Sequence, residues 1–280
     1  MIRDRQPARA RALGMGLQAA RTRAAKTGRQ VCAAAGMSLA SLSRTENGKR
    51  APSLVNVAAL LAIYGVTGDE RDDILDLAAK VHEPHWLETG DQLPRLLPAL
   101  AGFEAEAKLI VHFAPFMVPG LLQTPAYMRS MAVHANADDL VVQERIEARL
   151  KRQEILGKIV APQYVALLDE AALRRPFGGS EVMVQQLHWL IGRAQQPNIT
   201  IRVIPFRHGG YMNPGMYSLM EFREAPPIVY VEAEGASGFL DGPKATQRFR
   251  SRTATLEKIA LGSADSVNFL TRMVADYERS

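Results

Sequence analysis

The sequence predicts two domains: an all-helical N-terminal domain of five helices, and a C-terminal domain of mixed α/β or α+β type with about four or five strands. Apolar residues at helical spacing, separated by capping signals, run through the first 81 residues, whereas helical and strand-like patterns alternate from residue 95 onward. A length of 280 residues also favours two domains, at ~100–200 residues each. We expect domains at 1–81 and 95–280, joined by a Pro- and Gly-containing linker at 82–94.

The composition is typical of a soluble globular protein that acts in the cytoplasm. Hydrophobic residues make up 47% of the chain and charged residues 22%, and no apolar run approaches the ~18 residues of a membrane span. The basic N-terminus lacks the apolar segment of a secretory signal. Cys32 is the single cysteine, which rules out an intrachain disulfide and a cysteine-based metal cluster. We expect Cys32 to be a small core residue rather than a redox sensor.

Positive charge is concentrated at the N-terminus. Residues 1–66 carry eleven lysines or arginines and two acids, a net charge of +9, which leaves −4 for residues 67–280 of a chain whose total is +5. A local basic field attracts polyanions, so we expect this segment to contact DNA. The arm from Arg3 to Arg11 has two interpretations, a minor-groove reader or a disordered tail, and the tail is favoured.

Capping residues divide the basic segment into short helices. A first helix is predicted over 13–26, and Thr27 is an N-cap for a second that ends at Gly36. Ser38 begins a third helix, which Asn47 and Gly48 end. Two short helices joined by a tight glycine turn, with a helix before them, are the sequence form of a helix-turn-helix. A fourth helix follows the N-cap Ser53 and ends at Gly65, and a fifth is predicted over 69–81.

The C-terminal half alternates between helical and strand-like segments. Runs rich in β-branched and aromatic residues predict strands at 108–115, 164–168, 199–205, 216–222 and 228–231. Helical patterns occur at 95–107, from Thr124-Pro125 onward, and at 138–158, 181–195, 244–260 and 264–277. This alternation predicts a sheet covered by helices.

The segment from Thr27 to Pro52 resembles the Cro/repressor-type helix-turn-helix of the xenobiotic-response-element family. Thr27, Gly36 and Ser38 match that family's pattern, as does the ending Ser43-Arg44-Thr45-Glu46-Asn47-Gly48-Lys49-Arg50-Ala51-Pro52. Cys32 stands where the family usually has Ala. Gly28 replaces a common Gln, so a phosphate contact made there in the family is in doubt. The resemblance implies a DNA-binding transcriptional regulator.

The third helix is therefore expected to enter the major groove and supply the DNA contacts. Its candidates for base edges are Leu39, Ala40, Ser41 and Arg44. Arg44 can bind guanine through two hydrogen bonds, and Leu39 and Ala40 can meet thymine methyls; a salt bridge to a nearby acid is the alternative role for Arg44. The candidates for phosphate contacts are Arg29, Ser38, Asn47, Lys49 and Arg50.

Four motifs in the C-terminal half resemble the WhiJ-like, antitoxin-like helix-turn-helix regulators of actinobacteria. They are Val118-Pro119-Gly120-Leu121-Leu122-Gln123-Thr124-Pro125-x-Tyr127, Arg149-x-x-Arg152-Gln153, Leu168-Asp169-Glu170-x-x-Leu173-Arg174 and Ile204-Pro205-Phe206. Members of that family are commonly paired with a small acidic protein, which the resemblance implies as a partner here. The first motif has two interpretations: a ligand or partner site formed by Pro119, Gly120, Leu121, Gln123 and Tyr127, or a structural turn, which is favoured. Glu170 and Arg174 are expected to form an ion pair.

The sequence favours a homodimeric regulator that reads a pseudo-palindromic operator. An antitoxin-like module that captures a small protein is the alternative, and a small-molecule effector of the C-terminal domain is a third hypothesis. No nucleophile, P-loop or zinc-protease motif is present, so we expect no enzyme activity, no catalytic residues, no cofactor and no metal site. We expect no membrane partner either.

Overall fold

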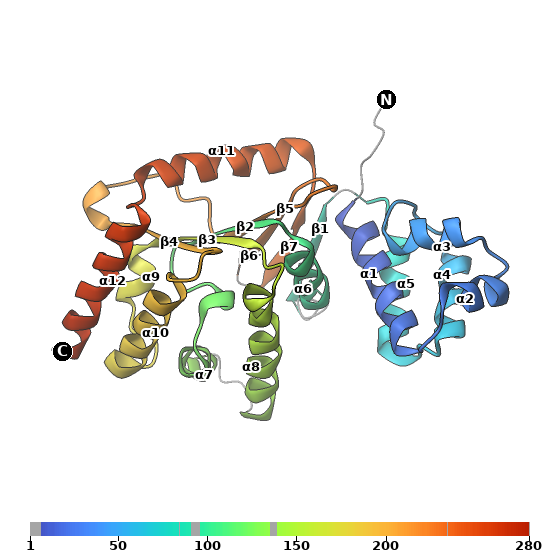
Figure 1. Cartoon of the computed structure of the whole chain (residues 1–280), viewed down its shortest axis with the longest axis horizontal. Coiled ribbons are helices and arrows are strands. Elements are labelled where there is room, and N and C mark those ends of the chain that lie inside the picture. Colours follow the sequence, from blue (N-terminus) through green and yellow to red (C-terminus); the bar gives the residue numbers. More distant parts are fainter. Residues whose placement is uncertain (1–6, 84, 91–95, 135–138, 234, 280) are drawn as a thin grey trace.

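A computed structural model describes residues 7–83, 85–90, 96–134, 139–233 and 235–279. Figure 1 shows a unit of short helices beside a larger domain in which helices cover a twisted sheet. This arrangement confirms the predicted fold class, an all-helical N-terminal part followed by a mixed α/β part.

Within residues 7–83, the helical unit contains α1 (Ala8–Arg23), α2 (Gly28–Ala35), α3 (Leu39–Glu46), α4 (Leu54–Tyr64) and α5 (Gly68–Ala79). The predicted N-caps Thr27, Ser38 and Ser53 are confirmed, because each side-chain oxygen accepts a hydrogen bond from a backbone N–H of the first turn. Gly36 and Gly65 adopt the left-handed conformation that ends α2 and α4. The helices enclose a core of leucine, valine and alanine side chains.

Helix α1 begins five residues earlier than predicted, at Ala8, and this corrects the role expected for the basic arm. Arg9 and Arg11 lie inside the helix and are buried, rather than in a tail or a minor-groove reader. The buried apolar residues of this turn are alanines that alternate with arginines. Such a sequence has too weak a hydrophobic pattern to predict a helix that faces a core. Arg3 and Arg5 lie outside the described residues.

The described part of the chain forms seven strands in one mixed sheet, ordered β1-β7-β6-β5-β2-β3-β4. β2 (Leu109–Ala114), β3 (Gln163–Asp169) and β4 (Ile199–Ile204) run parallel. The remaining neighbours are antiparallel: β5 (Tyr217–Glu221), β6 (Ile228–Ala233), β7 (Ala236–Leu240) and β1 (Trp86–Thr89). Five of these strands correspond to the predicted runs, and β1 and β7 were not predicted.

Strand β1 lies within residues 82–94, which the sequence assigned to a linker, and it pairs with β7 along its whole length. Its four residues are too few to show an alternating pattern. β7 was missed because its sequence, Ala-Ser-Gly-Phe-Leu, has little strand propensity. Gly238 is required there: a Cβ atom would come within 2.1 Å of the Trp86 carbonyl oxygen on β1.

Helices cover both faces of the sheet (Figure 1). On one face α11 (Pro243–Ile259) packs through Leu256 against a core that includes Phe113 and Tyr217. On the other, α6 (Leu96–Glu106), α10 (Gly179–Arg193) and α12 (Ser263–Glu278) enclose the larger core. Alternate residues of β2 contribute to the two cores, as the two-residue repeat of a strand requires.

The remaining helices lie in the crossovers between the parallel strands. The turn η2 (Gly120–Leu122), α7 (Pro125–His134), α8 (Asp139–Gln153) and η3 (Glu154–Gly157) join β2 to β3. The short α9 (Glu170–Arg174) precedes α10 on the way to β4, which η4 (Phe206–His208) follows. Among the described residues no helix has the length and apolar character needed to span a membrane.

Candidate nucleic-acid interface

The α2-turn-α3 segment is held in shape by local hydrogen bonds. The Thr27 hydroxyl accepts from the Gln30 N–H at 3.3 Å, while the Gln30 side chain accepts from the Thr27 N–H at 2.8 Å, forming a reciprocal capping box. Gly36, at φ 64°, makes the turn, and two residues later the Ser38 hydroxyl accepts from the Ser41 N–H at 3.1 Å. Capping therefore fixes the start of α3 relative to α2.

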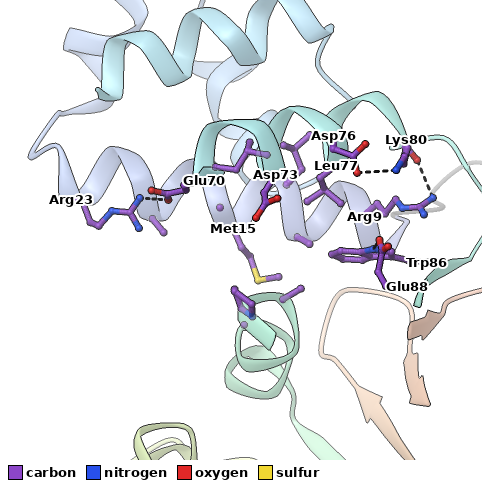
Figure 2. A pocket seen from close by; sticks show the side chains of 18 residues that line it. Arg9, Met15, Arg23, Glu70, Asp73, Asp76, Leu77, Lys80, Trp86 and Glu88 are labelled. Carbon is purple, nitrogen blue, oxygen red and sulfur yellow. Dashed lines mark hydrogen bonds and ion pairs between the residues drawn. The ribbon is translucent and has the colours of Figure 1, made fainter. Parts of the chain in front are cut away.

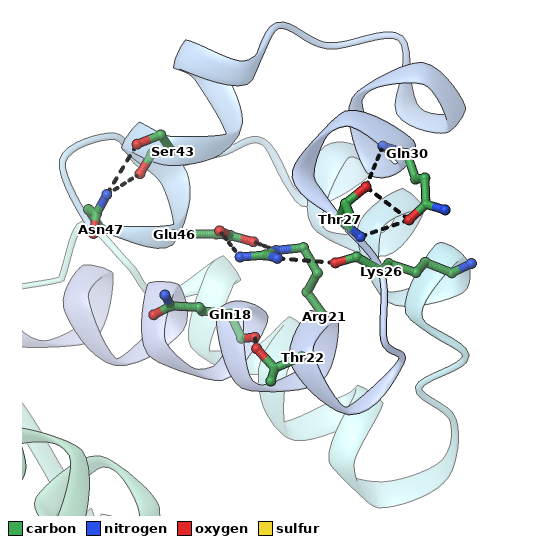
Figure 3. A network of polar contacts seen from close by, with 9 residues as sticks. All are labelled: Gln18, Arg21, Thr22, Lys26, Thr27, Gln30, Ser43, Glu46 and Asn47. Carbon is green, nitrogen blue, oxygen red and sulfur yellow. Dashed lines mark hydrogen bonds and ion pairs between the residues drawn. The ribbon is translucent and has the colours of Figure 1, made fainter.

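Helix α3 packs closely against α1, where a glycine of α1 allows the close approach and an ion pair joins the two helices. A Cβ atom at Gly14 would lie 2.4 Å from the Glu46 carbonyl oxygen, so only glycine permits this crossing. Arg21 of α1 donates through Nε and Nη2 to the two carboxylate oxygens of Glu46, at 2.6 and 3.0 Å (Figure 3). Its Nη1 also donates to the Lys26 carbonyl in the turn between α1 and α2. The pair raises the pKa of Arg21, so its charge is secure at any physiological pH.

The inner and outer faces of α3 differ in character. Leu42, Thr45 and Glu46 are buried against the helical core. Leu39, Ala40 and Arg44 are exposed, and Leu39 has 51% of its surface accessible. Within the described residues the Arg44 side chain makes no ion pair or hydrogen bond, so the salt bridge considered for it does not form there. The outward face offers a free guanidinium beside apolar groups, which suits base edges in a major groove.

Predicted phosphate-binding residues surround this face. Arg29, Asn47, Lys49 and Arg50 are all exposed. Asn47 donates to the Ser43 carbonyl at 2.8 Å, and Arg50 donates to the Ser41 hydroxyl at 2.9 Å. Ser41 is half-buried, and its hydroxyl already accepts the hydrogen bond from Arg50. This position favours a role in orienting Arg50 rather than a direct contact with a base.

The charge of this surface is one-sided. Between Thr27 and Ser53 the only acid is Glu46, whose carboxylate is buried with Arg21. Helices α2 and α3 also lie on the side of the helical unit away from the sheet domain, whereas α1 and α5 face it (Figure 1). The described part of the larger domain therefore does not cover the outer face of α3.

Sequence reasoning missed two contacts that hold this surface in place, the Arg21–Glu46 ion pair and the hydrogen bonds of Gln30. The Arg21–Glu46 pair joins positions 25 residues apart, and no local pattern reveals it. Gln30, in contrast, could have been found, because Thr-x-x-Gln is the signature of a capping box. Cys32 is half-buried and contacts the helical core, as expected of a small core residue.

The C-terminal motif expected as a turn or a ligand site is buried. Leu121, Gln123 and Tyr127 each expose 2% of their surface or less. The Gln123 side chain donates to the Val118 carbonyl at 2.7 Å, and the Tyr127 hydroxyl accepts from the Val118 N–H at 3.2 Å. These contacts support the structural-turn interpretation.

Side chains of α8 and α10 form hydrogen bonds with the backbone of this turn. Gln153 donates to the carbonyls of Gly120 and Gln123, and Gln186 donates to the Leu122 carbonyl. Pro119 is buried and Gly120 half-buried beneath α8. The motif therefore fastens the β2–β3 crossover, and a partner contact through these residues stays a prediction.

The expected ion pair between Glu170 and Arg174 is confirmed, with Arg174 Nε 2.6 Å from Glu170 Oε1. The second carboxylate oxygen of Glu170 accepts from the Phe206 N–H at 2.7 Å. Glu170, directly after β3, is thus tied to the segment that follows β4.

Comparison with protein families assigns both parts of the chain. A family model for a helix-turn-helix domain matches residues 12–74. The model of a domain of unknown function, DUF5753, matches residues 97–272, more than half of the chain. The chain belongs to the DUF5753 family and carries an N-terminal helix-turn-helix domain, which indicates a DNA-binding regulator. No curated protein and no solved structure matches it.

Proposed function

We propose that this protein regulates transcription by inserting α3 into the major groove of an operator. The observation that carries the proposal is the exposed face of α3, where the Arg44 side chain has no partner among the described residues and is flanked by the exposed cations Arg29, Lys49 and Arg50. A basic, acid-free surface around the start of an outward-facing helix is what groove binding requires.

The residues divide by role in this proposal. Arg44 reads a base edge, with Leu39 and Ala40 against thymine methyls. Arg29, Ser38, Asn47, Lys49 and Arg50 hold phosphates, and Ser41 orients Arg50 through the 2.9 Å hydrogen bond. Sequence preference then depends on few contacts, whereas affinity depends on the surrounding charge.

The finer features of the regulator belong to the same proposal. The motifs resembling Cro/repressor-type and WhiJ-like regulators support a cytoplasmic homodimer that reads a pseudo-palindrome, with its two recognition helices about 34 Å apart. The proposal includes no catalytic step and no cofactor. Capture of a small acidic protein in an antitoxin-like pair stays a prediction.

Fluorescence anisotropy with the protein's own promoter and a scrambled duplex, at two salt concentrations, tests the proposal. We expect selective binding to the promoter that weakens steeply with salt. Equal binding to both duplexes would contradict operator recognition.

Two variants separate base reading from phosphate contact. Arg44→Ala should cost ~1–3 kcal/mol on the promoter and relax the preference at one base pair. Lys49→Ala should weaken binding to every duplex by a similar factor and reduce the salt dependence. Arg71→Ala, on α5, removes an equal charge away from α3 and should leave binding unchanged. Equal losses on all sequences from Arg44→Ala would remove it from the base-reading set.

A further inference from the structure

Helix α11 is a strongly basic element of an otherwise acidic domain. Its residues Pro243–Ile259 include five lysines or arginines and one acid, a net charge of +4. Residues 67–280 carry −4 in total, so the remainder of that part of the chain carries −8. Figure 1 shows α11 on the outside of the sheet, on the opposite side from α7, α8 and α10. A local concentration of positive charge of this kind attracts a polyanion.

Contacts with the sheet fix which side of α11 faces outward. The Tyr217 hydroxyl on β5 lies 2.7 Å from the Thr253 hydroxyl, and the Tyr217 ring packs against Phe249 with 4.8 Å between the ring centres. Leu256 is buried in the same core. Rotation of the helix would break these three contacts, so the residues on its other side are held toward solvent.

Three exposed cations lie along that other side: Lys244, Arg248 and Lys258. At 3.6 residues per turn, their spacings of four and ten residues place them within about 80° of one another around the helix, and we call them the outward stripe. Among the residues that the structure describes, none of their side chains makes an ion pair or a hydrogen bond. Gln247 and Ser251, between them in the sequence, are also exposed and can donate hydrogen bonds.

The remaining charges of α11 lie away from the outward stripe. Arg250 donates to Glu221 of β5 at 2.9 Å. Arg252 and Glu257 are half-buried. Glu257, the one acid of this helix, lies about 140° around the helix from Lys244. The outward stripe is therefore free of acids on its own helix.

Cations at the contact between the two units are paired instead. Around a pocket of about 720 Å³ between α1, α5, β1 and α6, Arg23 pairs with Glu70, and Lys80 pairs with Asp76 at 2.9 Å (Figure 2). Those charges are neutralised by their neighbours, whereas the charges of the outward stripe remain available to a ligand.

The outward stripe is long enough to span several DNA phosphates. Lys244 and Lys258 are 14 residues apart, ~21 Å along the helix axis at 1.5 Å per residue. Over that distance each strand of a duplex presents about six phosphates. Acids on the other faces of the domain are screened over ~8 Å at physiological ionic strength, so the local charge decides what binds.

Helix α11 also begins beside the DNA-binding unit. The Ala8 N–H, at the start of α1, donates at 2.8 Å to Asp241, two residues before α11. The outward stripe thus starts close to the point at which the helical unit meets the sheet domain.

We propose that the outward stripe of α11 binds the phosphate backbone of double-stranded DNA without reading base sequence. Lys244, Arg248 and Lys258 contact phosphates, and Gln247 and Ser251 donate hydrogen bonds to the same strand. Phosphate binding by α11 needs no operator. Its contribution to operator affinity rests on the proposed function, because α3 must then hold the duplex as well.

Fluorescence anisotropy of the full-length protein, with the promoter duplex and a scrambled duplex of equal length, tests this contact. A triple variant makes the stripe neutral: Lys244→Gln, Arg248→Gln and Lys258→Gln. We expect affinity for both duplexes to fall by the same factor, about tenfold or more at low salt, with the preference for the promoter retained. The plot of log affinity against log salt should become shallower by ~2.7, since each phosphate contact contributes ~0.9. Unchanged affinity and slope would overturn the contact.

Two matched variants separate position from charge. The first removes the same charge from exposed positions outside α11 and the helical unit, and should leave affinity and slope unchanged: Lys158→Gln, Arg175→Gln and Arg272→Gln. The second keeps the charge of the stripe and should bind as the wild type does: Lys244→Arg, Arg248→Lys and Lys258→Arg. Equal losses from the two neutralising variants, or a loss in the charge-keeping variant, would overturn the assignment to the stripe's charge.

The same titrations distinguish this inference from the proposed function. Equal binding of the wild type to both duplexes, weakened in the neutral variant, would overturn operator recognition and keep the α11 contact. Selective binding that the neutral variant leaves intact would overturn only the α11 contact. Labelled poly-L-glutamate tests the other class of polyanion. Poly-L-glutamate binding that is lost in the neutral variant, with duplex affinity unaffected, would assign the stripe to an acidic protein and overturn the DNA contact.

Discussion

Arg21 and Glu46 show how a single buried ion pair positions the DNA-facing helix. The Glu46 side chain is 8% exposed and that of Arg21 is 20% exposed, so both charges are largely withdrawn from water. Two short hydrogen bonds offset the cost of that withdrawal. Burial and the nearby Glu46 carboxylate also raise the pKa of Tyr64, which keeps its hydroxyl protonated.

Glu46→Gln should destabilise the helical unit by about 1–3 kcal/mol, because the Arg21 guanidinium is left with a neutral acceptor. Urea unfolding measures the change. Glu70→Gln is the matched control: it breaks the pair with Arg23, whose side chains are 50% and 59% exposed, and should cost at most ~1 kcal/mol. Equal costs would show that burial adds nothing to the Arg21–Glu46 pair.

A second set of buried polar residues lies under α6 and α8 in the sheet domain. Glu104, 3% exposed, has a carboxylate oxygen 3.0 Å from Arg152 Nε. On the sheet below, His112 Nδ1 lies 2.8 Å from the Ser218 hydroxyl. Burial raises the pKa of Glu104 to about 7, although Arg152 and Arg149 act in the opposite direction. Burial and Arg152 lower the pKa of His112 to about 3.

These opposite shifts predict opposite pH dependences. The raised pKa of Glu104 stabilises the fold fully below the unfolded value of 4.5, and this contribution is lost as pH rises to about 7. The lowered pKa of His112 contributes stability above 6.5 that is lost as pH falls toward 3. The two contributions oppose each other between pH 4.5 and 6.5, so a variant is needed to separate them.

Glu104→Gln should therefore gain stability relative to the wild type as pH rises from 5 to 8, by an amount on the order of 3 kcal/mol. Urea unfolding of both proteins at several pH values measures this difference. A difference that moves in the opposite direction would show that attraction by Arg152 outweighs burial and keeps Glu104 ionised.

At the scale of elements, the crossing of α1 and α3 depends on a position where glycine has no conformational role. Gly14 is in the middle of α1, where alanine would ordinarily stabilise the helix by ~1 kcal/mol. The contacts of a Cβ atom there are the backbone carbonyl oxygens of Glu46 and Thr45, at 2.4 and 2.8 Å. Backbone atoms cannot rotate away as a side chain can, so α3 would have to move.

Gly14→Ala should consequently destabilise the protein by ~1–3 kcal/mol and weaken binding to every duplex, since α3 shifts as a unit. Gly16→Ala, two residues along the same helix, is the control. Its nearest neighbour is an Ile74 side-chain carbon at 4.0 Å, so it should be neutral or stabilising by up to ~1 kcal/mol. Thermal unfolding and anisotropy check both variants, and a stabilised Gly14→Ala would contradict the tight crossing.

The elements that could be predicted from the sequence are those fixed by contacts between residues close together in the chain. The starts of α2, α3 and α4 follow from Thr27, Ser38 and Ser53, because a cap acts within three residues. The small residues of β7 are explained only by the close packing of β1, which lies about 150 residues earlier in the chain. The first turn of α1 was missed for the same reason, since Ala8 belongs to a core only against the sheet domain.

On the scale of the whole molecule, α1 belongs to two cores at once. Ala8 and Ala12 contribute to the core of the sheet domain, whereas Leu13 and Leu17 contribute to that of the helical unit. The Ala8 N–H donates to Asp241 at 2.8 Å, before α11. The guanidinium of Arg11 lies 3.8 Å from the centre of the Phe222 ring and donates to Glu106 at 3.1 Å. The docking of the DNA-binding unit thus depends on the first turns of one helix.

Arg11→Met should loosen this docking while leaving the two cores intact. Methionine keeps the apolar contact with Phe222 but loses the cation–π interaction and the charged hydrogen bond, together worth ~2–4 kcal/mol. Hydrogen exchange should become faster in the first turns of α1 and in α6, and remain slow in α4 and β3. Arg23→Met, at the exposed far end of α1, should change neither region. Uniformly faster exchange throughout the chain would instead mean that Arg11 supports global stability, and that the two units do not move as separate bodies about α1.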